Sequence, residues 1–169
     1  MYAPSYGDTK EQVIRYTRNI LLFCNILKIK TIAGPATSGV VIAMACFMLS
    51  DKPLDVLFLG KKGYRRRNHS AGPQAMTAID NYSSRFPFGR ILIVDDCTET
   101  GKSFIDSIKE IRRYNLQQST IVGCVTSSFS SKSAYRIHSI YPDVRLFSLK
   151  HMSEVITYKG YDSIDLIDI

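Results

Sequence analysis

Two adjacent carboxylates, Asp95 and Asp96, are the side chains of this 169-residue sequence that are best suited to chemistry. A loop of hydroxyl, glycine and basic residues, 98–103, follows them directly. The hydroxyls and the backbone N–H groups of such a loop can bind a phosphate, and Gly101 lets the backbone approach the anion closely. Carboxylates alone would repel phosphate. The combination therefore indicates a ligand that carries phosphate together with ribose-like hydroxyls or a divalent metal ion.

The flanking residues predict how this segment is positioned. Residues 91–94 are four consecutive aliphatic residues with a β-branched bias, which is typical of a strand covered on both faces. After the loop, Phe104, Ile105, Ile108 and Ile111 recur at helical spacing. The order is therefore strand, acidic pair, loop and helix, and ligands of open α/β sheets bind at the carboxyl ends of such strands.

The loop ends in Gly101-Lys102-Ser103, as a nucleotide-binding P-loop does. That motif also needs a glycine at the position that Asp96 occupies, so the P-loop interpretation is rejected.

A second unit of the same kind lies earlier in the chain. Residues 28–34 form the expected first strand, and residues 34–39 form a loop of small and hydroxyl residues. Residues 40–49 are apolar nearly all round, which predicts a deeply buried helix. Its loop can offer hydroxyls and N–H groups to a second anionic group.

A long polar segment follows the strand expected at residues 54–59. It contains Lys61, Lys62, Arg65 and His69, and long loops in compact domains are usually functional or disordered. Residues 61–75 are therefore predicted to be a flexible loop, either a lid over the ligand or simply a solvated basic loop.

The remaining pattern completes an α/β domain. A helix is expected to about residue 27, strands at residues 119–126 and 144–149, and a helix at residues 132–141, with a serine-rich connector at 127–133. These elements predict an open parallel sheet of about five strands flanked by helices. Residues 1–169 are expected to form one domain, with residues 1–27 and 150–169 as candidates for a small hood.

Composition limits the class of protein. No apolar run approaches the length of a membrane span, and residues 1–10 do not look like a secretory signal, so a cytoplasmic location is expected. The four cysteines, Cys24, Cys46, Cys97 and Cys124, lie singly in apolar stretches and read as packing residues. The net charge of +7 permits nucleic-acid binding, but a binding site for a polyphosphate ligand also needs cations. The densest basic cluster falls in a single loop, which favours the polyphosphate site.

Residues 91–103 resemble the phosphoribosyl-pyrophosphate (PRPP) motif of the type I phosphoribosyltransferases. The resemblance implies a type I phosphoribosyltransferase-like fold and transfer of the 5-phosphoribosyl group of PRPP to a nucleobase, with release of pyrophosphate. It implies Mg²⁺ as cofactor, a homodimer, and neither nucleic acid nor membrane as partner.

The resemblance also implies roles for residues. Asp95 and Asp96 would bind the ribose hydroxyls, directly or through the metal ion. The 5-phosphate would be held by Thr98, Glu99, Thr100, Gly101, Lys102 and Ser103. Pyrophosphate would be held by Ala36, Thr37, Ser38 and Gly39, with help from Lys61, Lys62, Arg65 and His69. The residues expected in catalysis are Glu99, Asp95, Asp96 and Lys62.

The base remains open at this stage. The residues at 36–39 and the Lys61–Lys62 pair resemble orotate-type members, whereas Glu99 with Lys102 resembles the purine enzymes, in which an acid faces the base. Two other classes also remain open. One is a non-catalytic regulatory protein of the same fold that binds PRPP, a nucleotide or nucleic acid. The other, a PRPP synthetase-like relative, is disfavoured because such enzymes are roughly twice as long.

Overall fold

The computed structural model describes residues 10–35, 38–59, 89–113, 119–127, 129–151, 154–158 and 164–168. The helices are α1 (Lys10–Ile26), α2 (Ser38–Leu49), α4 (Lys102–Arg113) and α5 (Ser131–Ile140). The strands are β1 (Thr31–Pro35), β2 (Asp55–Leu59), β3 (Arg90–Val94), β4 (Thr120–Thr126), β5 (Arg145–His151), β6 (Glu154–Tyr158) and β7 (Ile164–Asp168). None of the helices in these ranges combines the length and apolarity that crossing a bilayer requires.

The strands form one sheet in the order β2-β1-β3-β4-β5-β6-β7. The first five pair in parallel, which confirms the predicted open parallel sheet of about five strands. Strands β6 and β7 continue the sheet antiparallel beyond β5. The C-terminal segment that was a candidate for a hood thus contributes two strands, of which β7 forms the edge of the sheet, and its role as a hood stays a prediction.

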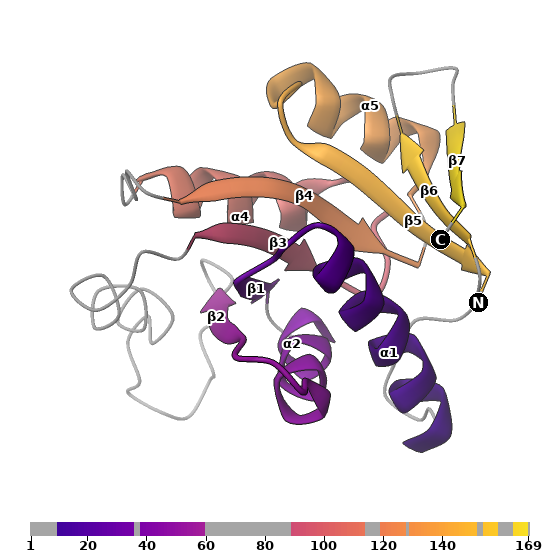
Figure 1. Cartoon of the computed structure of the whole chain (residues 1–169). Helices are drawn as coiled ribbons and strands as arrows, with labels where there is room; N and C mark the ends of the chain where they lie inside the picture. The colour runs from indigo at the N-terminus through magenta and orange to yellow at the C-terminus, as the bar shows by residue number, and fades with distance from the viewer. Residues whose placement is uncertain are drawn as a thin grey trace, which may run out of the picture.

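Helices cover both faces of the parallel strands (Figure 1). Helices α1 and α2 lie on one face over a core that contains Tyr16, Phe23 and Phe147. Helices α4 and α5 lie on the other face over a core that contains Phe104 and Ile137. Because both faces are covered, the residues of β3 from Ile91 to Val94 are all buried, as their continuous apolar run predicted.

Helix α2 is less buried than its sequence predicted. Gly39, Ile42, Ala43 and Cys46 are buried against the sheet, but Met48 on the outer side is 76% exposed. The all-round apolar pattern was therefore wrong as a sign of complete burial. The covering that this pattern implies is not supplied by the described part of the chain.

Strand order places the two predicted ligand loops side by side. The chain passes from β1 through α2 to β2 on one side of β1, whereas β3 pairs with β1 on its other side. The order therefore reverses between β1 and β3. In open α/β sheets this is the point at which the carboxyl ends of the strands leave a crevice for ligands.

Candidate active site at the β1–β3 switch point

The loop after β1 lies directly against the end of β3. A Cβ atom on Gly34 would lie 2.2 Å from the carbonyl oxygen of Gly39, and one on Gly39 would lie 2.6 Å from the carbonyl oxygen of Val94. No real Cβ atom tolerates such distances, so both positions require glycine. These glycines allow the first turn of α2 to sit beside the acidic pair that follows β3.

Asp95 connects the two loops. Its carboxylate oxygen Oδ1 accepts a hydrogen bond from the Ser38 hydroxyl at 3.0 Å and another from the Asp96 backbone N–H at 3.0 Å. Its own backbone N–H donates to the carbonyl oxygen of Val125, which continues the β3–β4 pairing. The side chain of Ser38, predicted from the first loop, and that of Asp95, predicted from the second, are therefore in direct contact.

The two carboxylates have different surroundings. Asp95 is only 6% exposed, whereas Asp96 is partly exposed and accepts a hydrogen bond from the Cys97 N–H at 2.7 Å. Burial raises the pKa of Asp95 to about 7, and the charge of Asp96 adds to this effect. Hydrogen bonds from the Asp96 backbone and from Ser38 act in the opposite direction. Near neutral pH, Asp95 can therefore both hold and release a proton.

The carbonyl oxygen of Asp96 accepts three hydrogen bonds from the end of β4. The donors are the Thr126 hydroxyl at 2.8 Å, the Ser127 N–H at 3.0 Å and the Ser127 hydroxyl at 2.6 Å. The Ser148 hydroxyl in turn donates to the carbonyl oxygen of Ser127. We call Thr126 and Ser127 the β4 clamp, because together they fix the peptide group that carries Asp96.

Tyr16 reaches the site from α1. It is fully buried, and its hydroxyl donates to the carbonyl oxygen of Asp95 at 3.3 Å. Burial, followed by the nearby charge of Asp95, raises its pKa well above the usual value, so the phenol stays protonated. Nothing in the helical pattern around Tyr16 distinguished it from an ordinary packing residue.

The predicted phosphate loop enters α4 through a left-handed glycine. Gly101 has φ +71°, and its N–H donates to the Thr98 hydroxyl at 2.9 Å. Thr98 is buried, while Glu99 and Thr100 are exposed. The Lys102 ammonium forms an ion pair with Asp106 one turn along α4. The buried hydroxyl of Thr98 therefore stabilises the conformation of the loop by accepting the hydrogen bond from Gly101.

The serine-rich segment before α5 supports this loop. The Ser130 hydroxyl donates to the carbonyl oxygen of Glu99 at 2.7 Å, and the Ser133 hydroxyl donates to that of Thr98 at 3.2 Å. Phe129 also forms a parallel β-bridge with Thr98. The segment that the sequence indicated as a connector is thus part of the site's support, and its density of serines is the signal that could have revealed this.

The cysteines do not all match their prediction. Cys24, Cys46 and Cys124 are buried, as expected, but Cys97 is exposed, so its assignment as a packing residue was wrong. Partial burial and the neighbouring charges of Asp96, Asp95 and Glu99 raise the pKa of the Cys97 thiol. A thiol that is held in its protonated form is a poor nucleophile.

Several predicted site residues lie outside the described residues. They are Ala36, Thr37, Lys61, Lys62, Arg65 and His69. The same holds for the predicted flexible loop at residues 61–75. The described part of the site therefore consists of Ser38 and Gly39 from the first loop and residues 95–103 from the second.

The sequence pattern of the phosphoribosyl transferase domain matches residues 9–162 of the chain. This range spans both ligand loops and nearly all of the sheet. The chain belongs to the type I phosphoribosyltransferase family. No curated protein sequence matches it significantly.

Solved structures of phosphoribosyltransferases share the fold. Orotate phosphoribosyltransferase of Mycobacterium tuberculosis H37Rv in complex with inorganic phosphate has a TM-score of 0.57 at 16% identity, and the match covers 82% of this chain and 70% of that one. The same enzyme in complex with PRPP has a TM-score of 0.54 at 16% identity, over 82% and 73%. Adenine phosphoribosyltransferase of Saccharomyces cerevisiae has a TM-score of 0.56 at 14% identity, over 86% and 89%. Because identity is this low, the likeness shows the fold and does not choose between the bases.

Proposed function

We propose that this phosphoribosyltransferase transfers the 5-phosphoribosyl group of PRPP to a nucleobase, either a purine or orotate, and releases pyrophosphate. The single observation that carries the proposal is the 3.0 Å hydrogen bond from Ser38 to Asp95. This hydrogen bond joins the loop after β1, which is suited to one anionic group, to the acidic pair after β3. The acidic pair is followed by the loop 98–103, which is suited to a second anionic group. PRPP is a ligand with a phosphate at one end, a diphosphate at the other and ribose hydroxyls between them.

In this proposal each part of PRPP binds to its own part of the site. The 5-phosphate would lie at the start of α4, where N–H groups and the helix dipole favour an anion. The ribose hydroxyls would face the carboxylates of Asp95 and Asp96. The diphosphate would lie at the start of α2, beside Ser38 and Gly39, with Lys61, Lys62 and the 61–75 loop as further partners.

The reaction then requires that the protein position PRPP and the base, and it needs no covalent intermediate with a side chain. A nitrogen of the base forms the new bond to C1 of the ribose, while the bond from C1 to the diphosphate oxygen breaks and pyrophosphate leaves with the electron pair. Two fixed anchors for the phosphates hold C1 in place while charge develops there. The β4 clamp serves this purpose because it fixes the backbone of Asp96.

The acidic pair fits Mg²⁺ as a cofactor that is shared with the substrate. Carboxylate oxygens are ligands that this ion prefers, and it commonly takes only one or two from the protein together with substrate phosphates. Within the described residues no cluster of three or more His, Cys, Asp or Glu side chains could hold a metal ion alone. Asp95 and Asp96 would hold the ion, which would supply positive charge to the departing pyrophosphate.

Glu99 is the residue proposed to act on the base. It is exposed at the rim of the phosphate loop, and the Ser130 hydroxyl holds its backbone carbonyl in place. A carboxylate at this position can accept the proton that a purine nitrogen loses as the new bond forms. A purine and orotate both remain acceptors within the proposal, and a cytoplasmic enzyme with reduced thiols is its expected setting.

A release assay tests the proposal. The protein is incubated with PRPP and Mg²⁺ and with one base at a time from a panel of orotate, uracil, hypoxanthine, guanine, xanthine, adenine and nicotinate. Pyrophosphate and the nucleotide product are then measured. Turnover with one base supports the proposal and identifies the acceptor. Saturable binding of PRPP without turnover on any base would contradict it and support a regulatory protein of the same fold.

The double variant Asp95→Asn, Asp96→Asn links turnover to the site. We expect turnover to fall at least about a hundredfold, because ribose and metal-ion contacts are lost together. Asp143→Asn is the matched control, since Asp143 pairs with Arg112 far along the chain from the site. Wild-type turnover in the folded double variant would refute the assignment of these carboxylates.

A further inference from the structure

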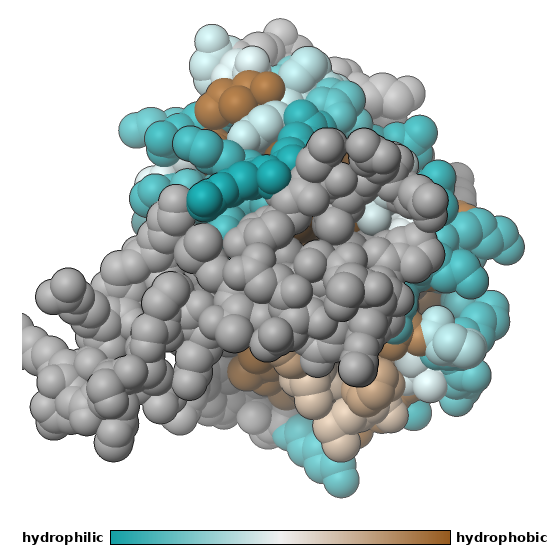
Figure 2. All heavy atoms as spheres, turned by 90° about the vertical axis from the view of Figure 1, so that its left-hand side faces the viewer, coloured by the Kyte–Doolittle hydropathy of each residue, from teal (hydrophilic) through white to brown (hydrophobic). Residues whose placement is uncertain are grey.

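The hydroxyl of Tyr16 lies in surroundings that are mostly apolar. Helices α1 and α2 pack on the sheet through a core that includes Ile20, Phe23 and Phe147, and Tyr16 is fully buried in it. Even the outer side of this layer carries apolar side chains of α2, which are brown and tan at the bottom of Figure 2. A buried hydroxyl that makes no hydrogen bond is destabilising, so the partner of the Tyr16 hydroxyl is informative.

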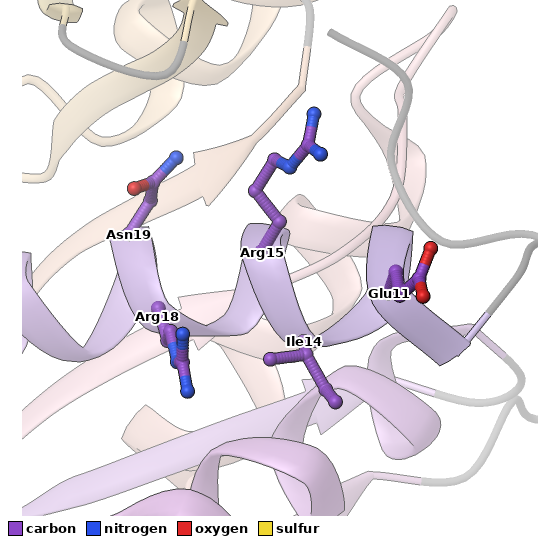
Figure 3. Close-up of a pocket in the computed structure, with 5 residues that line it drawn as sticks. All are labelled: Glu11, Ile14, Arg15, Arg18 and Asn19. Atoms are coloured by element: carbon purple, nitrogen blue, oxygen red, sulfur yellow. The ribbon is translucent and has the colours of Figure 1, made fainter.

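Helix α1 has a polar outer side and a buried inner side. Figure 3 shows the side chains that line a hollow on the surface of this helix, which are Glu11, Ile14, Arg15, Arg18 and Asn19. Tyr16 and Thr17 lie between them in the sequence, yet both are fully buried. The pattern of polar and apolar residues therefore fixes the rotation of α1, and this rotation points Tyr16 toward the sheet.

These two neighbouring hydroxyls have different kinds of partner. The Thr17 hydroxyl donates at 2.7 Å to the carbonyl oxygen of Val13, one turn back in the same helix. The Tyr16 hydroxyl donates to the carbonyl oxygen of Asp95, which lies 79 residues further along the chain. Within the described residues, neither the Tyr16 hydroxyl nor the Asp95 carbonyl oxygen has another hydrogen-bond partner. Tyr16 therefore connects α1 to the acidic pair, whereas Thr17 serves its own helix.

The peptide group between Asp95 and Asp96 is held at both of its polar atoms. Its carbonyl oxygen accepts from Tyr16 at 3.3 Å, and its N–H donates to the Asp95 carboxylate at 3.0 Å. Because a peptide group is planar, its carbonyl and its N–H can only turn together. Release of the carbonyl oxygen from Tyr16 would therefore also loosen the contact that holds the Asp95 carboxylate.

The acidic pair is anchored from two different elements. The β4 clamp holds the carbonyl oxygen of Asp96 through hydrogen bonds of 2.6–3.0 Å, and Tyr16 holds that of Asp95 from α1. Two successive peptide groups are thus fixed, one by a strand end and one by a helix. The Tyr16 bond is longer than those of the clamp, so its loss should have the smaller effect.

We propose that Tyr16 is a positioning residue for phosphoribosyl transfer, whose hydroxyl sets the orientation of the Asp95–Asp96 peptide and so of both carboxylates. This inference rests on the proposed function, in which these carboxylates bind the ribose hydroxyls of PRPP. Because Tyr16 is fully buried, it acts through the acidic pair and not on the substrate. Ribose contacts exist before the reaction as well as in the transition state, so loosening them weakens substrate binding more than it slows the chemical step.

Steady-state kinetics of Tyr16→Phe, which keeps the ring and removes the hydroxyl, test this role. We expect KM for PRPP to rise about fivefold, while kcat and KM for the base change less than about twofold. Thr17→Val is the matched control, because it removes one hydroxyl hydrogen bond from the next fully buried residue of α1 and should keep the wild-type KM. A merely structural effect would lower the folded fraction, and with it the apparent kcat, and leave KM for PRPP unchanged.

A second measurement needs no substrate, because Cys97 reports on the acidic pair. Its thiol is exposed and its N–H donates to the Asp96 carboxylate at 2.7 Å, whereas the three other cysteines are buried. Iodoacetamide should modify Cys97 at least about threefold faster in Tyr16→Phe than in the wild type, since a loosened pair holds the Cys97 backbone less firmly and modification depends on access. Thr17→Val should react at the wild-type rate, and in each protein the buried cysteines should stay unmodified.

The outcomes distinguish this inference from the proposed function. An active Tyr16→Phe enzyme with the wild-type KM for PRPP would overturn the role of Tyr16, as would an unchanged rate of Cys97 modification. Modification of all four cysteines in this variant would show that Tyr16 stabilises the fold as a whole and does not orient the pair. A wild type that neither binds PRPP in calorimetry nor releases pyrophosphate would overturn the proposed function, and with it a role in transfer, while the Cys97 rates would still decide whether Tyr16 orients the acidic pair.

Discussion

Single residues show how one strand end can hold two carboxylates with different properties. Asp95 is buried, and its pKa is raised to about 7 from an ordinary value of 3.8, while Asp96 is partly exposed. Burial without a cation within the described contacts favours the protonated form of Asp95. A ligand that brings positive charge would favour the ionised form instead, so binding and protonation are coupled at this residue.

The raised pKa predicts how stability depends on pH without ligand. Between about pH 4 and pH 7 the folded protein retains a proton on Asp95 that the unfolded chain has released, so the free energy of unfolding falls as pH rises. At about 1.4 kcal/mol per pKa unit, the fall is at most about 4 kcal/mol. Urea denaturation in EDTA across this range should show a shallower decline for Asp95→Asn than for the wild type.

The exposed Asp51, in the turn before β2, supplies the control for this measurement. Asp51→Asn makes the same change at the exposed surface and should reproduce the wild-type decline with pH. Parallel curves for Asp95→Asn and the wild type would show that Asp95 takes no part in the pH dependence.

The β4 clamp predicts a loss of activity without contact to the substrate. In the double variant Thr126→Val, Ser127→Ala, the Asp96 carbonyl keeps only the Ser127 N–H of its three donors. We expect kcat/KM for PRPP to fall about tenfold or more, since small displacements of positioning groups are costly. Stability should fall by about 1–2 kcal/mol. Both are measured on the same preparation, by the pyrophosphate release assay and urea denaturation.

Ser139→Ala serves as control, because the Ser139 hydroxyl donates to the Arg136 carbonyl within α5 at a comparable 3.0 Å. It should leave kcat/KM unchanged. If the β4 clamp variant lost stability and kept full activity, the three hydrogen bonds would serve only to secure the strand end.

At the scale of elements, the turn into α4 depends on a single glycine. Gly101 has φ +71°, and a Cβ atom there would lie 2.9 Å from Ile137 Cγ1 and 3.0 Å from the Ser133 carbonyl oxygen. Gly101→Ala therefore combines an unfavourable backbone conformation with contact to α5, and we expect a loss of about 2–3 kcal/mol. PRPP binding, measured by calorimetry, should weaken as well, because the phosphate loop is displaced.

Gly89 allows the two effects to be separated. It has φ +58°, but an added Cβ atom would approach only the Lys30 side chain, at 3.2 Å. Gly89→Ala should therefore cost about 1 kcal/mol, from the backbone alone, and leave PRPP binding intact. Equal losses of stability in the two variants would show that contact between the phosphate loop and α5 is unimportant.

The elements that sequence reasoning predicted are those with local signals. The continuous aliphatic run before Asp95 identified β3, because a strand that is buried on both faces is apolar at every position. The apolar residues at helical spacing after Gly101 identified α4, because only one face of this helix is buried. The contact of Ser38 with Asp95 was accessible from the rule that parallel strands end at one edge. The role of Tyr16 was not, because it depends on which helix lies over that edge.

The prediction that α2 is completely buried failed for a similar reason, because burial depends on which elements pack against the helix. An apolar helix indicates that all its faces are covered, but the sequence does not tell whether the cover comes from the same chain. In the structure, the inner face packs on the sheet and the outer face is exposed, as Met48 shows. Strands β6 and β7 were missed because their residues were equally compatible with a small covering segment.

At the scale of the whole molecule, the positive charge is unevenly distributed. The net charge of +7 creates a field that attracts polyanions, while α2 contributes no charge to it. Binding of PRPP, which is a polyanion, can therefore use the field of the whole protein. Because salt screens charge, this contribution to binding should weaken as the ionic strength rises.

The positive electrostatic field of the protein predicts how turnover depends on salt. Between about 50 and 500 mM KCl the Debye length shortens from roughly 14 Å to about 4 Å, so the attraction between the +7 protein and PRPP is progressively screened. We expect KM for PRPP to rise severalfold over this range, while KM for an uncharged purine base changes little. If KM for PRPP and KM for the base rose in parallel, salt would be acting on the folded structure, and the field of the whole protein would have no separate part in substrate capture.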